Sequence, residues 1–117
     1  MAIDKKGPAG WRIHPGEVLR EEFLKPMRVT PHRLAKALHV SAPTVNDIVL
    51  ERRGITPEMA ARLAVVFQTS EQFWLNLQAV YDISRVRSQK AKELRQLRPI
   101  VARASAPAEF APKTQRL

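Results

Sequence analysis

The chain has 117 residues, a formal net charge of +9, a sequence pI of about 10.9 and no cysteine. Its length fits one small domain, and its charge favours polyanions or acidic proteins as partners. The lack of cysteine excludes disulfides, thiolate nucleophiles and cysteine-bearing metal sites. No apolar run has the length of a signal-peptide core or a membrane span, so we expect a cytoplasmic protein without membrane contact.

The positive charge is concentrated in the last third of the chain. Residues 1–83 contain 11 Lys/Arg and 9 Asp/Glu, whereas residues 84–117 contain 9 Lys/Arg and 2 Asp/Glu. The composition of the two ends predicts a flexible N-terminal arm over 1–12 and a disordered tail over 99–117. A single domain is therefore expected over 13–98.

Helix starts are recognisable where Ser or Thr shortly precedes Pro or Glu. A Ser or Thr hydroxyl accepts a backbone N–H as an N-cap, and Pro is tolerated in the first turn. Besides the weaker start Pro15-Gly16-Glu17, these places are Thr30-Pro31, Ser41-Ala42-Pro43, Thr56-Pro57 and Ser70-Glu71. Apolar residues at helical spacing predict helices over about 15–25 (ending before Pro26), 31–38, 42–50, 57–67 and from 71 onward, then a basic helical extension over 84–98. No segment alternates with period two, so we expect an all-α fold.

The second and third predicted helices are joined by only three residues, His39-Val40-Ser41, which is typical of a helix-turn-helix. The second helix of such a pair enters the major groove of DNA with its N-terminal residues. Its outer side offers small, hydroxyl and amide side chains that suit base edges, namely Ser41, Ala42, Pro43, Thr44, Asn46 and Asp47. Arg33, Arg52 and Arg53 are placed to contact backbone phosphates.

The same pattern has a plainer interpretation, because any small α-helical bundle contains a short helix pair with small caps. Asp47 argues mildly against DNA, since a carboxylate is repelled by phosphates unless it accepts from a cytosine amino group. The predicted helix-turn-helix pair alone therefore favours DNA binding only slightly.

The helix that begins after Ser70 carries an aromatic and aliphatic stripe. Such a stripe usually packs on a neighbouring helix, and on a domain this small it also favours a dimer interface. We expect Trp74, Leu77 and Tyr81 in that interface, extended by Val86 and Leu94. The basic run that follows is open to three interpretations: a solvated helix face, a DNA arm with salt-sensitive affinity, or a surface for an acidic protein.

Catalytic and metal chemistry is poorly supported. His14, His32 and His39 form no pair with metal-ligand spacing. Glu17, Glu21 and Glu22 resemble a carboxylate site, but neither a nucleophile nor a phosphate-binding Gly loop accompanies them. We expect no enzyme activity, no metal and no cofactor.

Three segments, "IHPGEVLREEFLKPM", "LAKALHVSAPTVNDIVLERRGITPEMAARLAVVF" and "SEQFWLNLQAVYD", closely resemble the HigA-type antitoxins. That family belongs to the lambda-repressor-like (XRE) helix-turn-helix proteins and includes virulence-associated protein I homologues. The resemblance covers about residues 13–85. It implies a five-helix bundle with a C-terminal helical extension, a homodimer that represses its own operon by binding double-stranded operator DNA, and neutralisation of a HigB-type toxin, a RelE-like mRNA endonuclease.

The sequence departs from the family pattern at two positions. His39 stands where the turn usually has Gly, and His adopts the left-handed backbone at moderate cost, so we expect the turn to be kept. Pro31 stands where related repressors often have a phosphate-binding Gln, so that Thr30, His32 or Arg33 must replace that contact. A solitary regulator of the same fold without a toxin remains the alternative, because the sequence does not separate the two.

Overall fold

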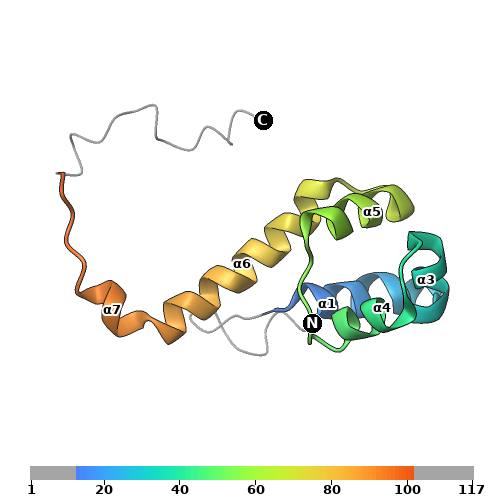
Figure 1. Ribbon diagram of the computed structural model, residues 1–117, viewed down its shortest axis with the longest axis horizontal. Coiled ribbons are helices and arrows are strands. Elements are labelled where there is room, and N and C mark those ends of the chain that lie inside the picture. Colours follow the sequence, from blue (N-terminus) through green and yellow to red (C-terminus); the bar gives the residue numbers. More distant parts are fainter. Residues whose placement is uncertain (1–12, 102–117) are drawn as a thin grey trace.

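The computed structural model describes residues 13–101, and all the regular secondary structure in that range is helical (Figure 1). The first helical run is continuous and consists of α1 (Pro15–Val18), the π-helical segment η2 (Leu19–Leu24) and α2 (Lys25–Met27). The helices that follow are α3 (Pro31–Leu38), α4 (Ala42–Val49), α5 (Pro57–Phe67), α6 (Glu71–Gln89) and α7 (Ala91–Arg95). The all-α prediction is confirmed. The expected arm over 1–12 lies outside the described residues, as does the tail from residue 102.

Four helices begin as their caps predict. The side-chain oxygens of Thr30, Ser41, Thr56 and Ser70 each accept the backbone N–H three residues later, at 3.1, 3.3, 3.1 and 3.0 Å. Each bond satisfies one of the donors that a helix start leaves without a partner. The starts of α3, α4, α5 and α6 are therefore set by local sequence.

The first helix does not stop before Pro26, so that prediction is wrong. The helix runs through the proline to Met27, and the segment just before it is π-helical, with the Lys25 N–H bonded to the Arg20 carbonyl. A proline ring ordinarily clashes with the carbonyl four residues earlier. The wider i→i+5 turn changes which carbonyls face the ring, and this accommodates Pro26 within the helix.

The helices of the body end in left-handed residues other than glycine: Arg28, His39, Glu51 and Gln68, with φ between 57° and 65°. At the end of α3 the His39 N–H bonds to the Lys36 carbonyl at 3.2 Å and the Val40 N–H to the Ala35 carbonyl at 3.0 Å. This pairing is a Schellman motif, which satisfies the last carbonyls of the helix. The prediction that His39 keeps the tight turn is confirmed.

The core lies where the first helical run, α4, α5 and the first half of α6 meet. Trp74 is fully buried there, and its ring packs 5.0 Å from that of Phe23 and 4.9 Å from that of Phe73, measured between centroids. Because one chain already buries it completely, the assignment of Trp74 to a dimer interface is wrong. Helical spacing marks a residue as buried, but it does not say whether the covering atoms belong to the same subunit.

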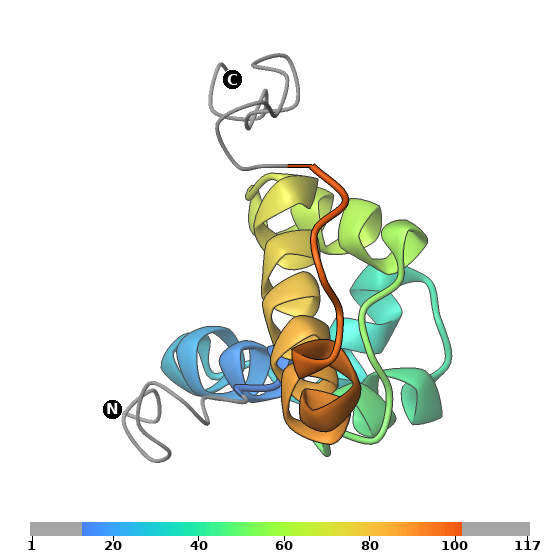
Figure 2. The same ribbon diagram turned by 90° about the vertical axis from the view of Figure 1, so that its left-hand side faces the viewer.

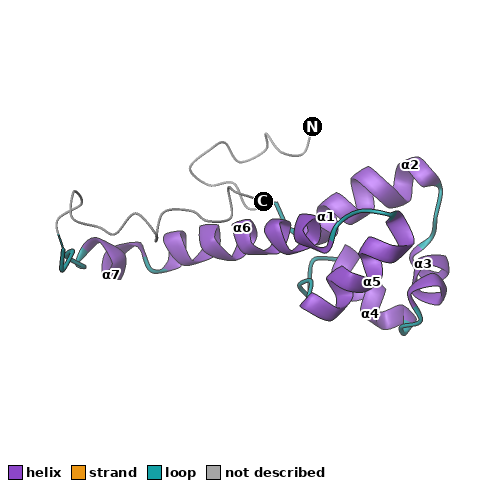
Figure 3. Ribbon diagram, turned by 90° about the horizontal axis from the view of Figure 1, so that it is seen from above, coloured by secondary structure: helices purple, strands orange, loops and turns teal. Residues whose placement is uncertain are grey.

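Helix α6 joins two different environments. Its first half lies between α1 on one side and α5 on the other (Figure 2), whereas its second half and α7 project away from the body (Figure 3). The predicted single helix over 84–98 is instead broken at Lys90 (φ −112°, ψ 21°) and ends at Arg95. No residue of α7 is buried. A short helix without tertiary packing is marginal, which explains the break.

Candidate nucleic-acid interface

The α3–α4 pair is held at a fixed angle by its inner face. Leu34, Ala35 and Leu38 of α3 are buried against Val45 and Ile48 of α4. These positions recur every three or four residues, so one face of each helix points inward and the opposite face is left outward. The outer face of α4 is thereby presented by a rigid support.

Most of the predicted base-contacting residues lie on that outer face. Ser41, Pro43 and Asn46 are exposed, whereas Thr44 and Ala42 are half-buried. The Ser41 and Thr44 hydroxyls lie 2.8 Å apart and hydrogen bond to each other. Their side chains are therefore pre-oriented at the start of α4, and the amide of Asn46 is available one turn further on.

The loop after α4 brings together three charged residues that the sequence places up to six positions apart. The Asp47 carboxylate lies 3.6 Å from the Arg52 guanidinium and 3.7 Å from that of Arg53. The turn itself is made by Glu51 in the left-handed conformation, and the Arg52 N–H donates to the Asp47 carbonyl at 2.8 Å. The sequence pattern predicts separate roles for these residues and does not predict their contact, because that contact depends on the turn.

The first helical run fixes the same loop from its other side. Arg20 donates to the Val49 carbonyl and pairs with the Glu51 carboxylate at 3.3 Å. Gly16 packs against the Ile48 carbonyl so closely that an added Cβ would lie 1.7 Å from that oxygen. The end of α4 is thus held by backbone contact and by one arginine, neither of which the sequence pattern revealed.

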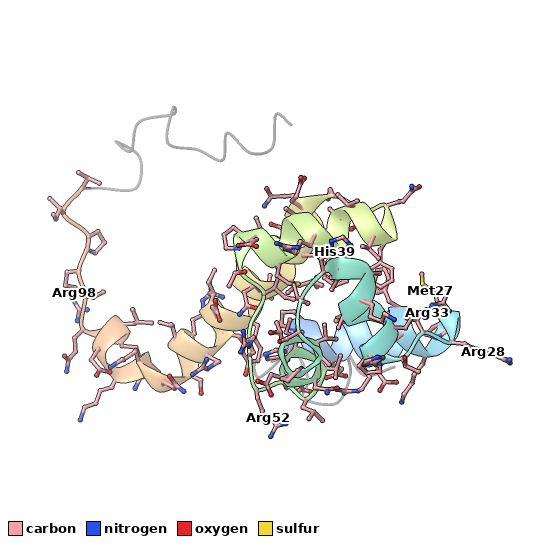
Figure 4. The ribbon with its side chains drawn as sticks, turned by 45° about the vertical axis from the view of Figure 1, so that its right-hand side comes forward. Met27, Arg28, Arg33, His39, Arg52 and Arg98 are labelled. Atoms are coloured by element: carbon pink, nitrogen blue, oxygen red, sulfur yellow. The ribbon has the colours of Figure 1, made fainter. Side chains whose placement is uncertain are left out.

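A second basic region surrounds the start of α3. Thr30, His32 and Arg33 are exposed there, although the Thr30 oxygen is already occupied as an N-cap. Beside them a groove of about 440 Å³ has an apolar floor and is rimmed by Lys25 and Arg28. Figure 4 shows Arg28 and Arg33 at the end of the body near the α2–α3 turn, with Arg52 projecting from the loop after α4. Lys25 and Arg28 were not predicted from sequence, because they lie at the end of the first helical run and outside the helix-turn-helix pair.

The residues predicted for a dimer interface are divided between the body and the extension. Leu77 is half-buried against the core, and Tyr81 packs edge-on against His14 with centroids 4.8 Å apart. Val86 and Leu94 are exposed on the projecting segment. The structure adds two exposed apolar side chains of α6 to this surface, Val80 at 64% and Ile83 at 48%.

His14 is a buried titratable group at the joint between α1 and α6. Its Nδ1 accepts the Gly16 N–H at 2.8 Å, and burial lowers the pKa of His14 below its ordinary value of 6.5. The nearby carboxylates of Glu51 and Asp82 oppose that shift, and Arg20 and Arg85 add to it.

Among residues 13–101, the His, Asp and Glu side chains form no group that would hold a metal ion. Within the same range no helix is long and apolar enough to span a membrane.

The short turn between α3 and α4, the buried inner face and the exposed outer face define a helix-turn-helix protein, and a helix-turn-helix family model matches residues 21–74. Virulence-associated protein I of Dichelobacter nodosus is 54% identical over 78 residues, which cover 67% of this chain and 72% of the relative. Antitoxin HigA-1 of Vibrio cholerae is 33% identical over 88 residues, or 75% of this chain and 83% of that protein. The solved structure of Pseudomonas aeruginosa antitoxin HigA with the higBA promoter superposes with a TM-score of 0.74 at 49% identity, covering 77% of this chain and 99% of that chain. The chain belongs to this family of HigA-type helix-turn-helix antitoxins.

Proposed function

We propose that this protein is a sequence-specific DNA-binding antitoxin that represses its own operon and neutralises a HigB/RelE-type mRNA endonuclease. The observation that carries the proposal is the outer face of α4, where exposed hydroxyl and amide groups lie on a rigid support and Arg52 and Arg53 follow in the loop after the helix, beside Asp47. The Pseudomonas relative, whose structure contains the higBA promoter, has the same fold. The proposal assigns no catalytic activity to this chain, because its family consists of DNA-binding regulators.

Base readout is assigned to α4 and phosphate contact to its surroundings. Asn46 suits adenine, and the Thr44 methyl suits the methyl of thymine, with Ser41, Ala42, Pro43 and Asp47 completing the surface. Arg52 and Arg53 contact phosphates on one side, and Thr30, His32 and Arg33 do so on the other. Lys25 and Arg28 extend the second group, because they rim the groove beside Thr30.

Dimerisation is assigned to α6 and the extension. Leu77 and Tyr81 cover the edge of the body, and Val86 and Leu94 leave apolar surface in solvent. A second copy would bury this surface and place two α4 helices on half-sites about one helical turn, roughly 34 Å, apart. We assign the function to the cytoplasm, at the nucleoid, where operator DNA is found.

The DNA part of the proposal is tested by footprinting the protein on the promoter of its own operon. A palindromic protected region, kept when random DNA is added at moderate salt, is the expected result. Asn46→Ala should then reduce the preference for the operator by about 1–3 kcal/mol. Protection equal to that of random DNA would refute specific binding, and unchanged preference in Asn46→Ala would refute the assignment of α4.

The toxin part is tested separately. An adjacent reading frame should encode a small basic protein of RelE-like length, which should co-purify with this chain and lose its mRNA cleavage in the complex. The absence of any such gene, together with intact operator binding, would favour the solitary regulator instead.

A further inference from the structure

Asp47 is the only acidic residue on α4, and it lies on a surface that otherwise suits DNA. It follows Pro43 and Thr44 by four and three residues, so all three side chains share one face of the helix. Its carboxylate lies between the two guanidinium groups of Arg52 and Arg53 without reaching hydrogen-bond distance of either, at 3.6 and 3.7 Å. The same carboxylate is therefore near both the base-reading face and the phosphate-binding arginines.

Stability does not account for this arrangement. The side chains of Arg52 and Arg53 are 65% and 51% exposed, and exposed ion pairs contribute little to folding. The turn is already held by the backbone bond from the Arg52 N–H to the Asp47 carbonyl and by Arg20 on the Glu51 carboxylate. The carboxylate instead partly neutralises the two cations that would otherwise attract any phosphate backbone.

On the basis of the proposed DNA-binding function, we propose that Asp47 is a specificity-determining residue that couples base identity to phosphate clamping. When Arg52 and Arg53 turn to phosphates, the carboxylate is separated from its cations and faces the base edges. A cytosine N4 amino group then donates to it and replaces the two guanidinium partners. In the major groove guanine and thymine present hydrogen-bond acceptors where cytosine presents its amino group, and adenine presents its amino group beside the N7 acceptor. Each of these bases therefore leaves the negative charge of the Asp47 carboxylate poorly compensated.

The consequence is that both arginines bind phosphate fully only when the correct base pair is present. On non-operator DNA the carboxylate competes for the arginines and weakens the non-specific complex. Asp47 therefore improves selectivity by penalising wrong sequences, rather than by adding affinity for the right one.

The test compares wild type, Asp47→Asn and Glu51→Gln for binding to the operator, to operators changed at one base pair each, and to random DNA. Asp47→Asn retains the backbone bond and the side-chain size. Glu51→Gln is a matched control, because it removes one charge from the same loop where the carboxylate pairs with Arg20 instead. Thermal unfolding of each variant checks that the fold is retained.

For wild type we expect one C·G position in each half-site at which any change costs roughly 5- to 150-fold in affinity. In Asp47→Asn this position should become tolerant, and affinity for random DNA should rise about two- to fivefold. Glu51→Gln should keep the discrimination at that position.

Two results would overturn the inference. Equal weakening of operator and random DNA by Asp47→Asn would mean that the carboxylate only positions the arginines. Unchanged discrimination in the single-base-pair scan would mean that the ion pairs are a surface feature without effect on readout. Either result leaves operator binding by wild type intact, whereas absence of any operator preference in wild type would overturn the proposed function as well.

Discussion

The body of the molecule and its projecting segment obtain their structure in different ways. From His14 to Tyr81 the chain encloses a core in which Leu19, Val45 and Trp74 have at most 1% of their surface exposed. From Arg85 to Arg98 the described side chains include six Lys/Arg and one Glu, and no residue is buried. The difference shows that one chain is sufficient to bury the core of the body, whereas the apolar and basic side chains of the extension are left in solvent in the single chain.

The largest expected effect comes from removing the centre of the body. Trp74→Ala should lower the free energy of unfolding by about 3–5 kcal/mol, because it deletes a fully buried ring from a close-packed aromatic cluster. Leu97→Ala in the extension is the control and should change the free energy of unfolding by less than about 0.5 kcal/mol. Urea denaturation followed by circular dichroism measures both, and a similar decrease in the two variants would remove the contrast.

The next effect tests whether the exposed face of α6 pairs with a second copy. Replacing both Val80 and Ile83 with Asp should give a folded monomer, because these side chains are exposed in the single chain. Operator affinity should then fall by about 10²- to 10⁴-fold, since two linked half-site contacts become one. Analytical ultracentrifugation at micromolar concentration measures the mass, and a wild-type monomer there would refute the dimer.

The extension as a DNA arm is tested by neutralising its charges. Replacing Lys90, Lys92 and Arg95 with Gln should weaken binding to operator and random DNA about equally. The slope of log affinity against log salt should become shallower by roughly 0.9 for each phosphate that the variant no longer neutralises. Toxin neutralisation should be unaffected, because the proposed antitoxin body ends before these residues. An unchanged affinity and salt slope would identify the run as a solvated helix face.

The smallest effect concerns the joint between the two regions. Because the pKa of His14 is lowered in the folded state, its contribution to stability is complete above the unfolded value of about 6.5 and decreases as the pH falls below it. The free energy of unfolding should therefore decrease as the pH falls from 7.5 to 5, because protonation of His14 is less favourable in the folded than in the unfolded state. His14→Asn keeps an N-cap acceptor and should show a weaker dependence over this range. Equal pH dependence in the two proteins would exclude His14 as the cause.

The parts of the fold that depend on local chemistry were predictable from sequence. Thr30, Ser41, Thr56 and Ser70 each cap a helix within three residues, so their roles do not depend on distant segments. The left-handed turn at His39 was predicted from the family resemblance, because that position usually has Gly, and His can adopt the same backbone conformation.

What was missed depends on tertiary structure. Helical spacing identified Trp74 as buried, but its partner Phe23 lies 51 positions earlier, so the pattern did not distinguish a core from an interface. The first helix continues through Pro26 because the segment before it is π-helical, and no residue type in the sequence predicts a π-helical segment. The proximity of Asp47 to Arg52 and Arg53 requires the reversal of the chain at Glu51.

The left-handed helix ends have a consequence for engineering the protein. Arg28, His39, Glu51 and Gln68 each hold a β-carbon in a backbone conformation that costs about 1 kcal/mol relative to glycine. His39 and Gln68 are exposed at α3 and α5 ends away from the Asp47 loop, so glycine there would relieve the strain without altering the α4 surface. For a domain of this size each kcal/mol corresponds to about 4–8 °C in Tm. The double substitution with glycine at His39 and Gln68 should therefore raise the Tm, by less than the strain alone suggests because glycine loses more entropy on folding.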